Sequence, residues 1–450
     1  MSSLNSSKLQ ELLEHPTEIW PTLNLLIRQY SAMNSKDDFD PNDAYCMWIL
    51  SKTSRSFALV IQELDAEMRK AICLFYLILR GLDTIEDDVA FLKDNPAEKR
   101  KMLCEFHETI EKRGWNLTGC GETKYERHLM ENFHVIIDQY LRLKKRYRLV
   151  IKDITQRMGH GMAEFLGSGT DRVHTIQEWD KYCHYVAGLV GIGLSNLFAS
   201  STLEDPSFAN ADKLSNSMGL FLQKTNIIRD YYEDMVETRA FWPEEVWSKY
   251  AKELDEFMLA ENRKNAVCCL NELVTNALEH IPDCLEYMGR LRTRANFSFC
   301  AIPQVMAIGT LAACYNNPQV FTPNRVKMRL GEMSMVFHQT QSMEDVYLQF
   351  DKYLEVIQQK LPNPRIDPTS TRTRKLLAKL KSLTSTHARH SNKQKFLEGA
   401  SIPLAHRPGQ TPSSSSDSPN LLKAITGLMF AAGSSYFMHP RRSKAITARL

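Results

Sequence analysis

Two short acidic motifs of the same form stand out in this sequence. Asp83–Asp87 reads D-T-I-E-D and Asp230–Asp234 reads D-Y-Y-E-D. In a helix, positions i, i+3 and i+4 lie on one face, so each motif would present three carboxylates to the same side. Like charges at this spacing repel one another, and we therefore expect a compensating cation at each motif.

Mg²⁺ is the cation that this set of donors favours. It prefers oxygen ligands and commonly takes one or two carboxylates together with substrate phosphate oxygens. Two such faces opposed across a helical bundle predict a site that binds a diphosphate, with Arg55, Arg80 and Arg229 as partners for the remaining phosphate oxygens. A diphosphate neutralised in this way becomes a good leaving group. A single motif of this type is also typical of a solvated helix end, and the pair favours chemistry.

An apolar run precedes each motif, at Leu74–Leu79 and at Met218–Leu222. Such a lining would suit a long hydrocarbon chain attached to the diphosphate. Ordinary core packing of amphipathic helices explains the same residues, so both interpretations stay open.

Gly188, Gly191 and Gly193 lie in a predicted helix, just after Tyr182 and Tyr185. Glycine costs about 1 kcal/mol relative to alanine inside a helix, so three together indicate either close helix packing or room for a ligand. A tyrosine at this place could move a proton near a carbocation, or could be a core residue with a satisfied hydroxyl.

Helical periodicity, with apolar residues three and four apart, extends over most of residues 9–360. Hydrophobic residues make up 43% of the chain, enough for a sizeable core, and 19 glycines with 18 prolines are few for 450 residues. The sequence therefore predicts an all-α fold with one large helical-bundle domain over residues 1–365. A net charge of +3 from 56 basic and 53 acidic residues gives no indication of nucleic-acid binding.

The composition changes after Pro364. Residues 366–420 are first basic and then rich in Ser and Pro, which predicts a disordered linker. In the last segment, residues 421–450, the stretch Ala424–Met438 runs 15 residues without charge, short of the ~20 that span a bilayer comfortably. It could be a short membrane anchor or an interfacial helix.

Seven segments resemble, in order and spacing, those of the squalene synthases in the squalene/phytoene synthase family. They are "TSRSFALVIQEL", "FYLILRGLDTIEDD", "RMGHGMAEFL", "EWDKYCHYVAGLVGIGLS", "SMGLFLQKTNIIRDYYED", "FWPEEVW" and "CAIPQVMAIGTLAACYNN". The resemblance covers Tyr45 to Gly331, and the organisation is similar to that of fungal members. It implies an isoprenoid-synthase bundle with a central apolar cavity. It also implies Mg²⁺-dependent head-to-head condensation of two farnesyl diphosphates to presqualene diphosphate, followed by NADPH-dependent reduction to squalene for sterol (ergosterol) biosynthesis.

The resemblance also implies roles for individual residues. Proton transfer in the first half-reaction falls to Tyr182, and metal binding falls to Asp83, Glu86, Asp87, Asp230 and Asp234, whose aspartates are also expected to be catalytic. Binding of the NADPH cofactor is implied for Arg55, Arg80, Arg229, Lys327 and Arg329. Substrate binding is implied for Ser54, Phe57, Phe75, Tyr76, Val190, Leu194, Gln223, Asn226, Arg239, Phe299 and Pro303.

Several alternatives remain open at this point. Lys327 and Arg329 form a K-x-R pattern that is also typical of a solvated face. A product formed without reduction, or a non-enzymatic helical scaffold whose acidic faces bind Ca²⁺ or basic partners, are the competing functions. The loop that holds Lys124 matches the family only loosely, so no role is assigned to it. Members of the family are anchored in the endoplasmic reticulum membrane with the catalytic domain facing the cytosol, and we expect the same place and a monomer for this chain.

Overall fold

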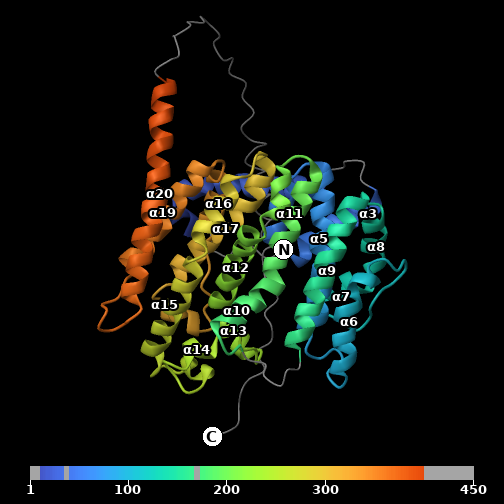
Figure 1. Cartoon of the computed structure of the whole chain (residues 1–450), viewed down its shortest axis with the longest axis horizontal. Helices are drawn as coiled ribbons and strands as arrows, with labels where there is room; N and C mark the ends of the chain where they lie inside the picture. Colours follow the sequence, from blue (N-terminus) through green and yellow to red (C-terminus); the bar gives the residue numbers. More distant parts are fainter. Residues whose placement is uncertain (1–10, 35–39, 167–172, 400–450) are drawn as a thin grey trace, which may run out of the picture. The chain divides into compact units, whose positions relative to one another are not determined.

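The computed structural model describes residues 11–34, 40–166 and 173–399, and every regular element in these ranges is a helix (Figure 1). Side chains are not described for residues 29–34, 55, 56 and 386–399. By its contacts the chain divides into two compact units. One contains residues 1–36, 329–338 and 401–450, and the other contains residues 37–328 and 339–400.

The helices follow one another along the chain without an intervening sheet in the described ranges. From the N-terminus to the second acidic motif they are α2 (Pro16–Asn34), α3 (Pro41–Thr53), α4 (Arg55–Gln62), α5 (Ala66–Asp87), α6 (Pro96–Thr109), α7 (Lys124–Glu131), α8 (Phe133–Leu141), α9 (Lys145–Phe165), α10 (Ile176–Cys183), η1 (His184–Gly188), α11 (Leu189–Ser201), η2 (Pro206–Asn210), α12 (Asp212–Arg229) and α13 (Tyr231–Val236). The remainder are α14 (Glu244–Trp247), η3 (Leu254–Met258), α15 (Arg263–Leu278), α16 (Ile281–Gly289), α17 (Arg294–Cys314), η4 (Pro318–Phe321), α18 (Leu330–Gln339), α19 (Met343–Gln359) and α20 (Ser370–Gly399).

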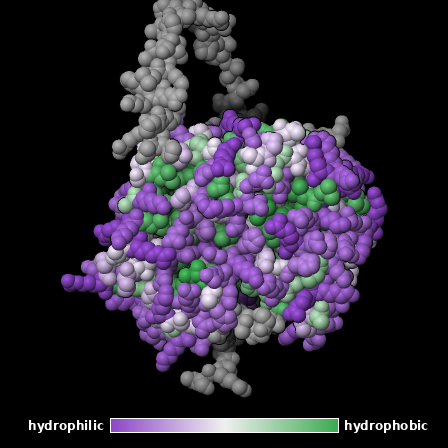
Figure 2. All heavy atoms as spheres, in the orientation of Figure 1, coloured by the Kyte–Doolittle hydropathy of each residue, from purple (hydrophilic) through white to green (hydrophobic). Residues whose placement is uncertain are grey.

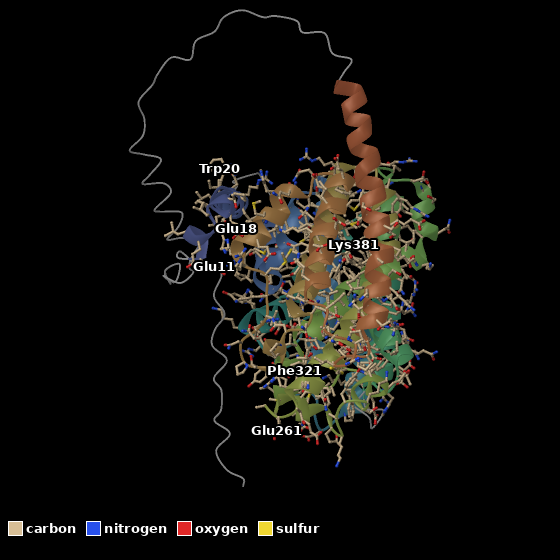
Figure 3. All side chains as sticks on the ribbon, turned by 90° about the vertical axis from the view of Figure 1, so that its left-hand side faces the viewer. Glu11, Glu18, Trp20, Glu261, Phe321 and Lys381 are labelled. Carbon is tan, nitrogen blue, oxygen red and sulfur yellow. The ribbon has the colours of Figure 1, made fainter. Side chains whose placement is uncertain are left out.

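The smaller unit contains α2 and nearly all of α18. Glu18 on α2 is buried and forms an ion pair of 2.6 Å with Arg329, the residue before α18. Gly331 lets α18 approach this carboxylate, because a Cβ there would lie 2.1 Å from Glu18 Oε2. Figure 3 shows Glu18 and the exposed Trp20 on the same helix.

Helices α5, α9, α11, α12 and α17 form the centre of the larger unit, where α5 contacts α9 and α11, and α12 contacts α11 and α17 (Figure 1). Helix α5 begins at a good N-cap, because the Asp65 side chain accepts hydrogen bonds from the amides of Glu67 and Met68. The C-terminal end of α5 is bound by a buried lysine of α6. The Lys99 ammonium donates hydrogen bonds to the carbonyls of Glu86 (2.8 Å) and Asp88 (2.9 Å). Both ends of the helix that holds the first motif are therefore fixed.

The glycines near Tyr182 serve close helix packing. A Cβ on Gly191 would lie 2.2 Å from the carbonyl oxygen of Ser215 on α12, and one on Gly219 would lie 2.3 Å from that of Ala187. Gly193 instead leaves room for a side chain, since its Cβ would lie 2.6 Å from the ring of Phe75. Of the two interpretations that the sequence left open, the described structure supports close packing.

The prediction of a disordered linker is corrected for residues 370–399, which form helix α20. Thr373, Leu377, Leu380 and Thr384 are spaced three or four residues apart and are buried, so this part of the basic segment has an amphipathic face. It packs against α19, α15 and α16, and Lys381, labelled in Figure 3, pairs with Glu355 on α19. Residues 400–450, which include the expected Ser/Pro-rich part and the expected anchor, lie outside the described residues.

Two described stretches, Ile176–Ser201 and Arg294–Cys314, are long and apolar enough to cross a membrane by length and composition alone. In their most apolar windows 44% and 78% of the residues are buried, and both stretches pack against α12, as core helices do. On the face drawn in Figure 2, hydrophilic residues predominate and hydrophobic ones appear as separate patches. Exposed apolar side chains such as Leu149 and Val236 belong to different helices, which is usual for protein surfaces.

Candidate active site

The first acidic motif lies on an accessible stripe of an otherwise buried helix. From Ala71 to its end at Asp87, α5 is buried except at Tyr76, Arg80, Asp83, Glu86 and Asp87. These positions are three or four residues apart, apart from the last two, and so share one face. The structure therefore places the predicted carboxylates, one predicted arginine and one predicted aromatic residue on the same accessible side of the helix.

The second motif differs from the expected continuous helix. Helix α12 ends at Arg229, Asp230 occupies the junction, and α13 begins at Tyr231. Asp230 is bound by two guanidinium groups. Arg229 forms a two-pronged pair with it (2.8 and 2.5 Å), and Arg325 donates to it at 2.7 Å and lies 3.4 Å from Glu233. Asp230 thus pairs with both arginines at the junction of α12 and α13.

Arg239 joins the two motifs. Its guanidinium lies 3.3 Å from Asp87 of the first motif and 3.2 Å from Asp234 of the second, with a further pair of 2.6 Å to Glu237. Two segments about 150 residues apart in sequence therefore face one another across a single side chain, as the bundle hypothesis requires. The prediction that the motifs oppose each other is met by these distances.

Burial raises the pKa of the carboxyls in the first motif. The pKa of Asp83 rises to about 7, and the negative charge of Asp87 adds to the effect while Arg80, 3.9 Å away, opposes it. The pKa of Glu86 is also raised, by burial and then by Asp87 and Asp83. The pKa of Asp87 is raised by burial, against the lowering effect of Arg239 and Arg80. Burial thus disfavours the ionised form of all three carboxyls, and a nearby cation would favour it.

In the second motif the pKa values of the two aspartates shift in opposite directions. Burial raises the pKa of Asp234 to about 7, although Arg239 lowers it. Burial acts in the same direction on Asp230, but the hydrogen bonds and charges of Arg229 and Arg325 outweigh it and lower the pKa of this carboxyl. Asp230 is consequently an ionised partner of arginine, while Asp234 belongs electrostatically with the first motif.

Tyr182 lies beside the acidic cluster. Its ring stacks on Phe241 with centroids 5.1 Å apart and meets Phe165 edge-on at 5.4 Å. Burial raises the pKa of its hydroxyl well above the ordinary value, and the charges of Glu86 and Asp87 raise it further. The phenol is therefore protonated near neutral pH and close enough to the carboxylates to be affected by their charge.

The predicted apolar residues fall into two groups. Phe57, Tyr76, Val190, Leu194 and Pro303 keep part of their surface accessible, and the rings of Phe57 and Tyr76 lie 5.6 Å apart. They belong to α4, α5, α11 and α17, of which α4 contacts α5 and α17, and α5 contacts α11. Phe75 and Phe299 are buried behind this layer, at 1% and 3% exposure, so they support the wall from within the core.

The predicted polar residues are placed as follows. Gln223 is half-buried and Asn226 is exposed, and with Asp230 they have the spacing of one face of α12. Ser54 is half-buried at the start of α4, next to Arg55, whose side chain lies outside the described part. Substrate contact by these residues stays a prediction.

The five basic residues expected to bind NADPH have different surroundings, and their shared role stays a prediction. Arg80 donates to the Tyr76 hydroxyl at 3.1 Å and has a buried Nε without a hydrogen-bond partner. Lys327 is exposed. Arg229 is bound to Asp230, and Arg329 belongs to the smaller unit, where it pairs with Glu18.

Arg325 is a site residue that the sequence reasoning missed. It lies in a segment without helical periodicity, two residues before Lys327, and its pairing with Asp230 depends on chain folding over 95 residues. The only available signal was its place in the basic segment "NRVKMRL".

The donors fit Mg²⁺ by their chemistry. All the acidic ligands offer oxygen, which this hard cation prefers. Burial is the main cause of the raised pKa of three of them in the first motif, so a bound cation would favour their ionised form. In the part of the chain that the structure describes, no three His, Cys, Asp or Glu side chains come close enough to hold one ion by themselves. Oxygen ligands from a substrate would complete such a site, as is usual for Mg²⁺.

Comparisons with known proteins agree with this geometry. The sequence model of the squalene/phytoene synthase family matches residues 50–332. The chain belongs to the squalene/phytoene synthase family. It is similar to the squalene synthase of Mus musculus, at 47% identity over 373 residues, which cover 82% of this chain and 87% of the relative. The squalene synthase of Nicotiana benthamiana is 48% identical over 372 residues, with the same coverage.

A solved structure supports the same assignment for the fold. The complex of TcSQS with the ligand BPH1237 is 41% identical to this chain and superimposes with a TM-score of 0.74, covering 77% of this chain and 100% of that chain. The predicted resemblance, the all-α fold of the isoprenoid-synthase type and the expectation of an enzyme are thereby confirmed for this member of the squalene/phytoene synthase family. The non-enzymatic scaffold is correspondingly disfavoured.

Proposed function

We propose that the protein is a squalene-forming enzyme that joins two farnesyl diphosphates head to head and reduces the product. The observation that supports this most directly is the pairing of Arg239 with Asp87 and Asp234, which sets the two acidic motifs opposite each other. A site with two carboxylate clusters suits a reaction in which two diphosphates leave. The similarity to squalene synthases over 82% of the chain supports the same reaction.

The acidic residues would hold the diphosphates through Mg²⁺ ions. Asp83, Glu86 and Asp87 would bind Mg²⁺ on one wall, and Asp230 and Asp234 would do so on the other. When bound, the ion neutralises the charge that develops on the leaving diphosphate. Arg80 and Arg239 each have a buried Nε without a protein partner, which suits them to donate hydrogen bonds to phosphate oxygens.

Tyr182 would act on protons in the first half-reaction. Its hydroxyl stays protonated because burial and the charges of Glu86 and Asp87 raise its pKa. A protonated phenol beside the departing diphosphate can transfer its proton to the leaving group, and the phenolate so formed can then accept a proton from the condensing carbon chain. The stacked ring of Phe241 fixes the direction of this hydroxyl.

The apolar wall would exclude water from the carbocations that form when diphosphate leaves. Phe57, Val190, Leu194 and Pro303 have accessible apolar surface on contacting helices, and aromatic faces stabilise nearby cations by about 1–2 kcal/mol each. NADPH, when bound, supplies the hydride of the second half-reaction. Its phosphates would be bound by Arg80, whose buried Nε has no hydrogen-bond partner, and by the exposed Lys327.

The place of the enzyme in the cell is also a proposal. We propose that residues 421–450 attach it to the endoplasmic reticulum membrane with the catalytic domain in the cytosol, as a monomer. Membrane fractionation of the full chain and of a chain ending at residue 399 tests this, because only the full chain should sediment with membranes.

The function is tested with the full-length protein, farnesyl diphosphate, Mg²⁺ and NADPH. We expect squalene with NADPH and presqualene diphosphate when NADPH is left out. A hydrocarbon formed equally well without NADPH would show a non-reductive synthase instead. No product under either condition, from protein with a cooperative thermal transition, would contradict the proposal.

A further inference from the structure

Lys224 on α12 is almost completely buried, with 1% of its side chain exposed. Its ammonium lies 2.6 Å from Asn276 Oδ1, 3.0 Å from His280 Nε2 and 2.5 Å from Asp180 Oδ1. The ring of Trp179 lies below it, with its centroid 4.8 Å away. Two N–H groups of the ammonium donate hydrogen bonds, to Asn276 and His280, and the contact with Asp180 is an ion pair.

The charges in this cluster are balanced. Asp180 supplies the counter-charge, and Asn276 is neutral. Burial and the nearby Lys224 lower the pKa of His280 to about 3, against a smaller raising effect of Asp283, so the imidazole is neutral and its Nε2 can accept a hydrogen bond from the ammonium. A buried lysine is tolerated only with partners of this kind.

The three partners come from different elements. Asp180 lies on α10, Asn276 on α15, and His280 directly before α16. Replacing a buried ion pair by apolar residues of similar volume is often neutral or stabilising, so stability alone does not explain a lysine at this position. Unlike an apolar side chain, the Lys224 ammonium bonds in fixed directions, so it can fix the position of one helix along another.

The helix that is fixed in this way contains Tyr182. Asp180 lies two residues before Tyr182, and after Cys183 the chain enters the π-helical turn η1, a form that is uncommon and often found at functional sites. Lys224 lies six residues before Asp230 on the helix that leads into the second acidic motif. The Lys224 ammonium therefore links α10, which contains Tyr182, to α12, which leads into the second acidic motif.

We infer that Lys224, through its pair with Asp180, is a positioning residue that sets the place of the Tyr182 hydroxyl relative to the acidic cluster. This rests on the proposed function, in which Tyr182 acts in the first half-reaction only. Misplacing a reacting group by about 1 Å can cost about 100-fold in rate. Loss of the pair should therefore slow the first half-reaction selectively.

The test measures the two half-reactions separately in full-length protein. Formation of presqualene diphosphate is followed without NADPH, and conversion of added presqualene diphosphate to squalene is followed with NADPH. For Asp180→Asn and Lys224→Met we expect kcat of the first to fall about 10- to 100-fold with little change in KM, and the second to stay within about twofold. Lys224→Arg keeps the charge and should recover part of the loss.

Lys360→Met is the matched control. Lys360 is half-buried and its ammonium donates to main-chain carbonyls of α17, at 2.7 Å for Ala312, with no hydrogen bond to α10 or α12 among the described residues. It should lower Tm without changing the ratio of the half-reactions. If Lys224→Met does not fold, Asp180→Asn decides, because Asp180 keeps 42% of its side chain exposed.

The inference is overturned if Asp180→Asn folds and leaves the ratio of the two half-reactions unchanged, or lowers both equally. Failure of the wild-type protein to form either product would contradict the proposed function and is seen before any variant is compared.

Discussion

The two acidic motifs have the same D-x-x-E-D pattern and occupy different structural settings. Asp83–Asp87 forms the last turn of one continuous helix, α5, whose final carbonyls accept hydrogen bonds from Lys99. Asp230–Asp234 straddles a junction between α12 and α13, where Arg229 and Arg325 bind the first carboxylate. Identical spacing in the sequence has therefore produced two different sets of neighbours.

The neighbours decide the charge of each motif. Burial raises the pKa of Asp83 to about 7, whereas two guanidinium groups lower the pKa of Asp230 in spite of burial. At the first motif, burial outweighs the nearby Arg80 and Arg239, whereas at Asp230 of the second motif Arg229 and Arg325 outweigh burial. A sequence motif thus specifies which donors are present, and the packing around it specifies how strongly they attract a metal ion.

The largest effect is expected at the first motif. Asp83→Asn removes a carboxylate that would hold Mg²⁺, so kcat should fall at least ~100-fold, as for other groups that stabilise developing charge. Total farnesyl diphosphate turnover and Tm measure this together. Asp94→Asn, the same change at an exposed position in the following loop, should leave turnover within about twofold. Near-normal turnover of Asp83→Asn would show that this carboxylate does not hold a catalytic cation.

A second change acts on the link between the motifs. Arg239→Lys keeps one positive charge but cannot reach Asp87 and Asp234 with two separate N–H groups, as the guanidinium does. We expect kcat/KM for farnesyl diphosphate to fall about 10- to 50-fold, a size typical of a lost charge-assisted hydrogen bond. Arg113→Lys, at an exposed pair with Asp138, is the matched control and should be unchanged. Full activity of Arg239→Lys would mean that the bridge does not organise the site.

Much of this arrangement could be predicted from the sequence because it depends on local pattern. Helical periodicity predicted the all-α fold, and the spacing within Asp83–Asp87 predicted one accessible face on α5, as observed. The same reasoning was wrong about the second motif, because spacing does not reveal that α12 ends at Arg229. It was also wrong about residues 370–399, where basic composition hid the buried face around Leu377 and Leu380.

Contacts between distant segments could not be predicted in this way. Nothing in the sequence around Arg325 or Lys224 indicates that one binds Asp230 and the other Asp180. Both pairs depend on how helices far apart in the chain pack, and a single sequence has no information on that packing beyond hydrophobic pattern. The resemblance to a known family supplied the roles of Tyr182 and the apolar wall, which spacing alone left open.

The supports of the two motifs also differ in their response to acid. Lys99 behind the first motif donates to carbonyl groups, whereas Lys224 behind the second has a neutral histidine, His280, as a partner. The pKa of His280 is about 3 in the folded protein against an ordinary value of 6.5, so the unfolded chain binds an additional proton between these values. Stability therefore falls as the pH decreases from 6.5 toward 3, and this contribution is fully present above 6.5.

His280→Gln keeps an acceptor for Lys224 and removes the titrating group. Its free energy of unfolding should change less with pH below 6.5, by up to about 1.4 kcal/mol per pH unit, or tenfold in the unfolding equilibrium constant. Urea unfolding at several pH values measures this difference. His160→Gln, at an exposed histidine, should keep the slope of the wild-type protein. An unchanged slope in His280→Gln would place the acid sensitivity elsewhere.

The substitution with the smallest expected effect is Arg325→Ala, which makes the surroundings of the second motif more similar to those of the first. Arg325 provides one of the two guanidinium charges on Asp230, and Arg325→Ala leaves that carboxylate with Arg229 alone. The net charge of the site becomes more negative, so Mg²⁺ should bind about threefold more tightly, a size typical of a partly exposed ion pair.

The increase of Tm on adding Mg²⁺ without substrate measures this affinity independently of turnover. Lys327→Ala removes the same charge two residues away, at an exposed position, and should change the affinity less. Equal shifts for the two variants would mean that the general field of the basic segment, and not the specific pair with Asp230, sets the difference between the motifs.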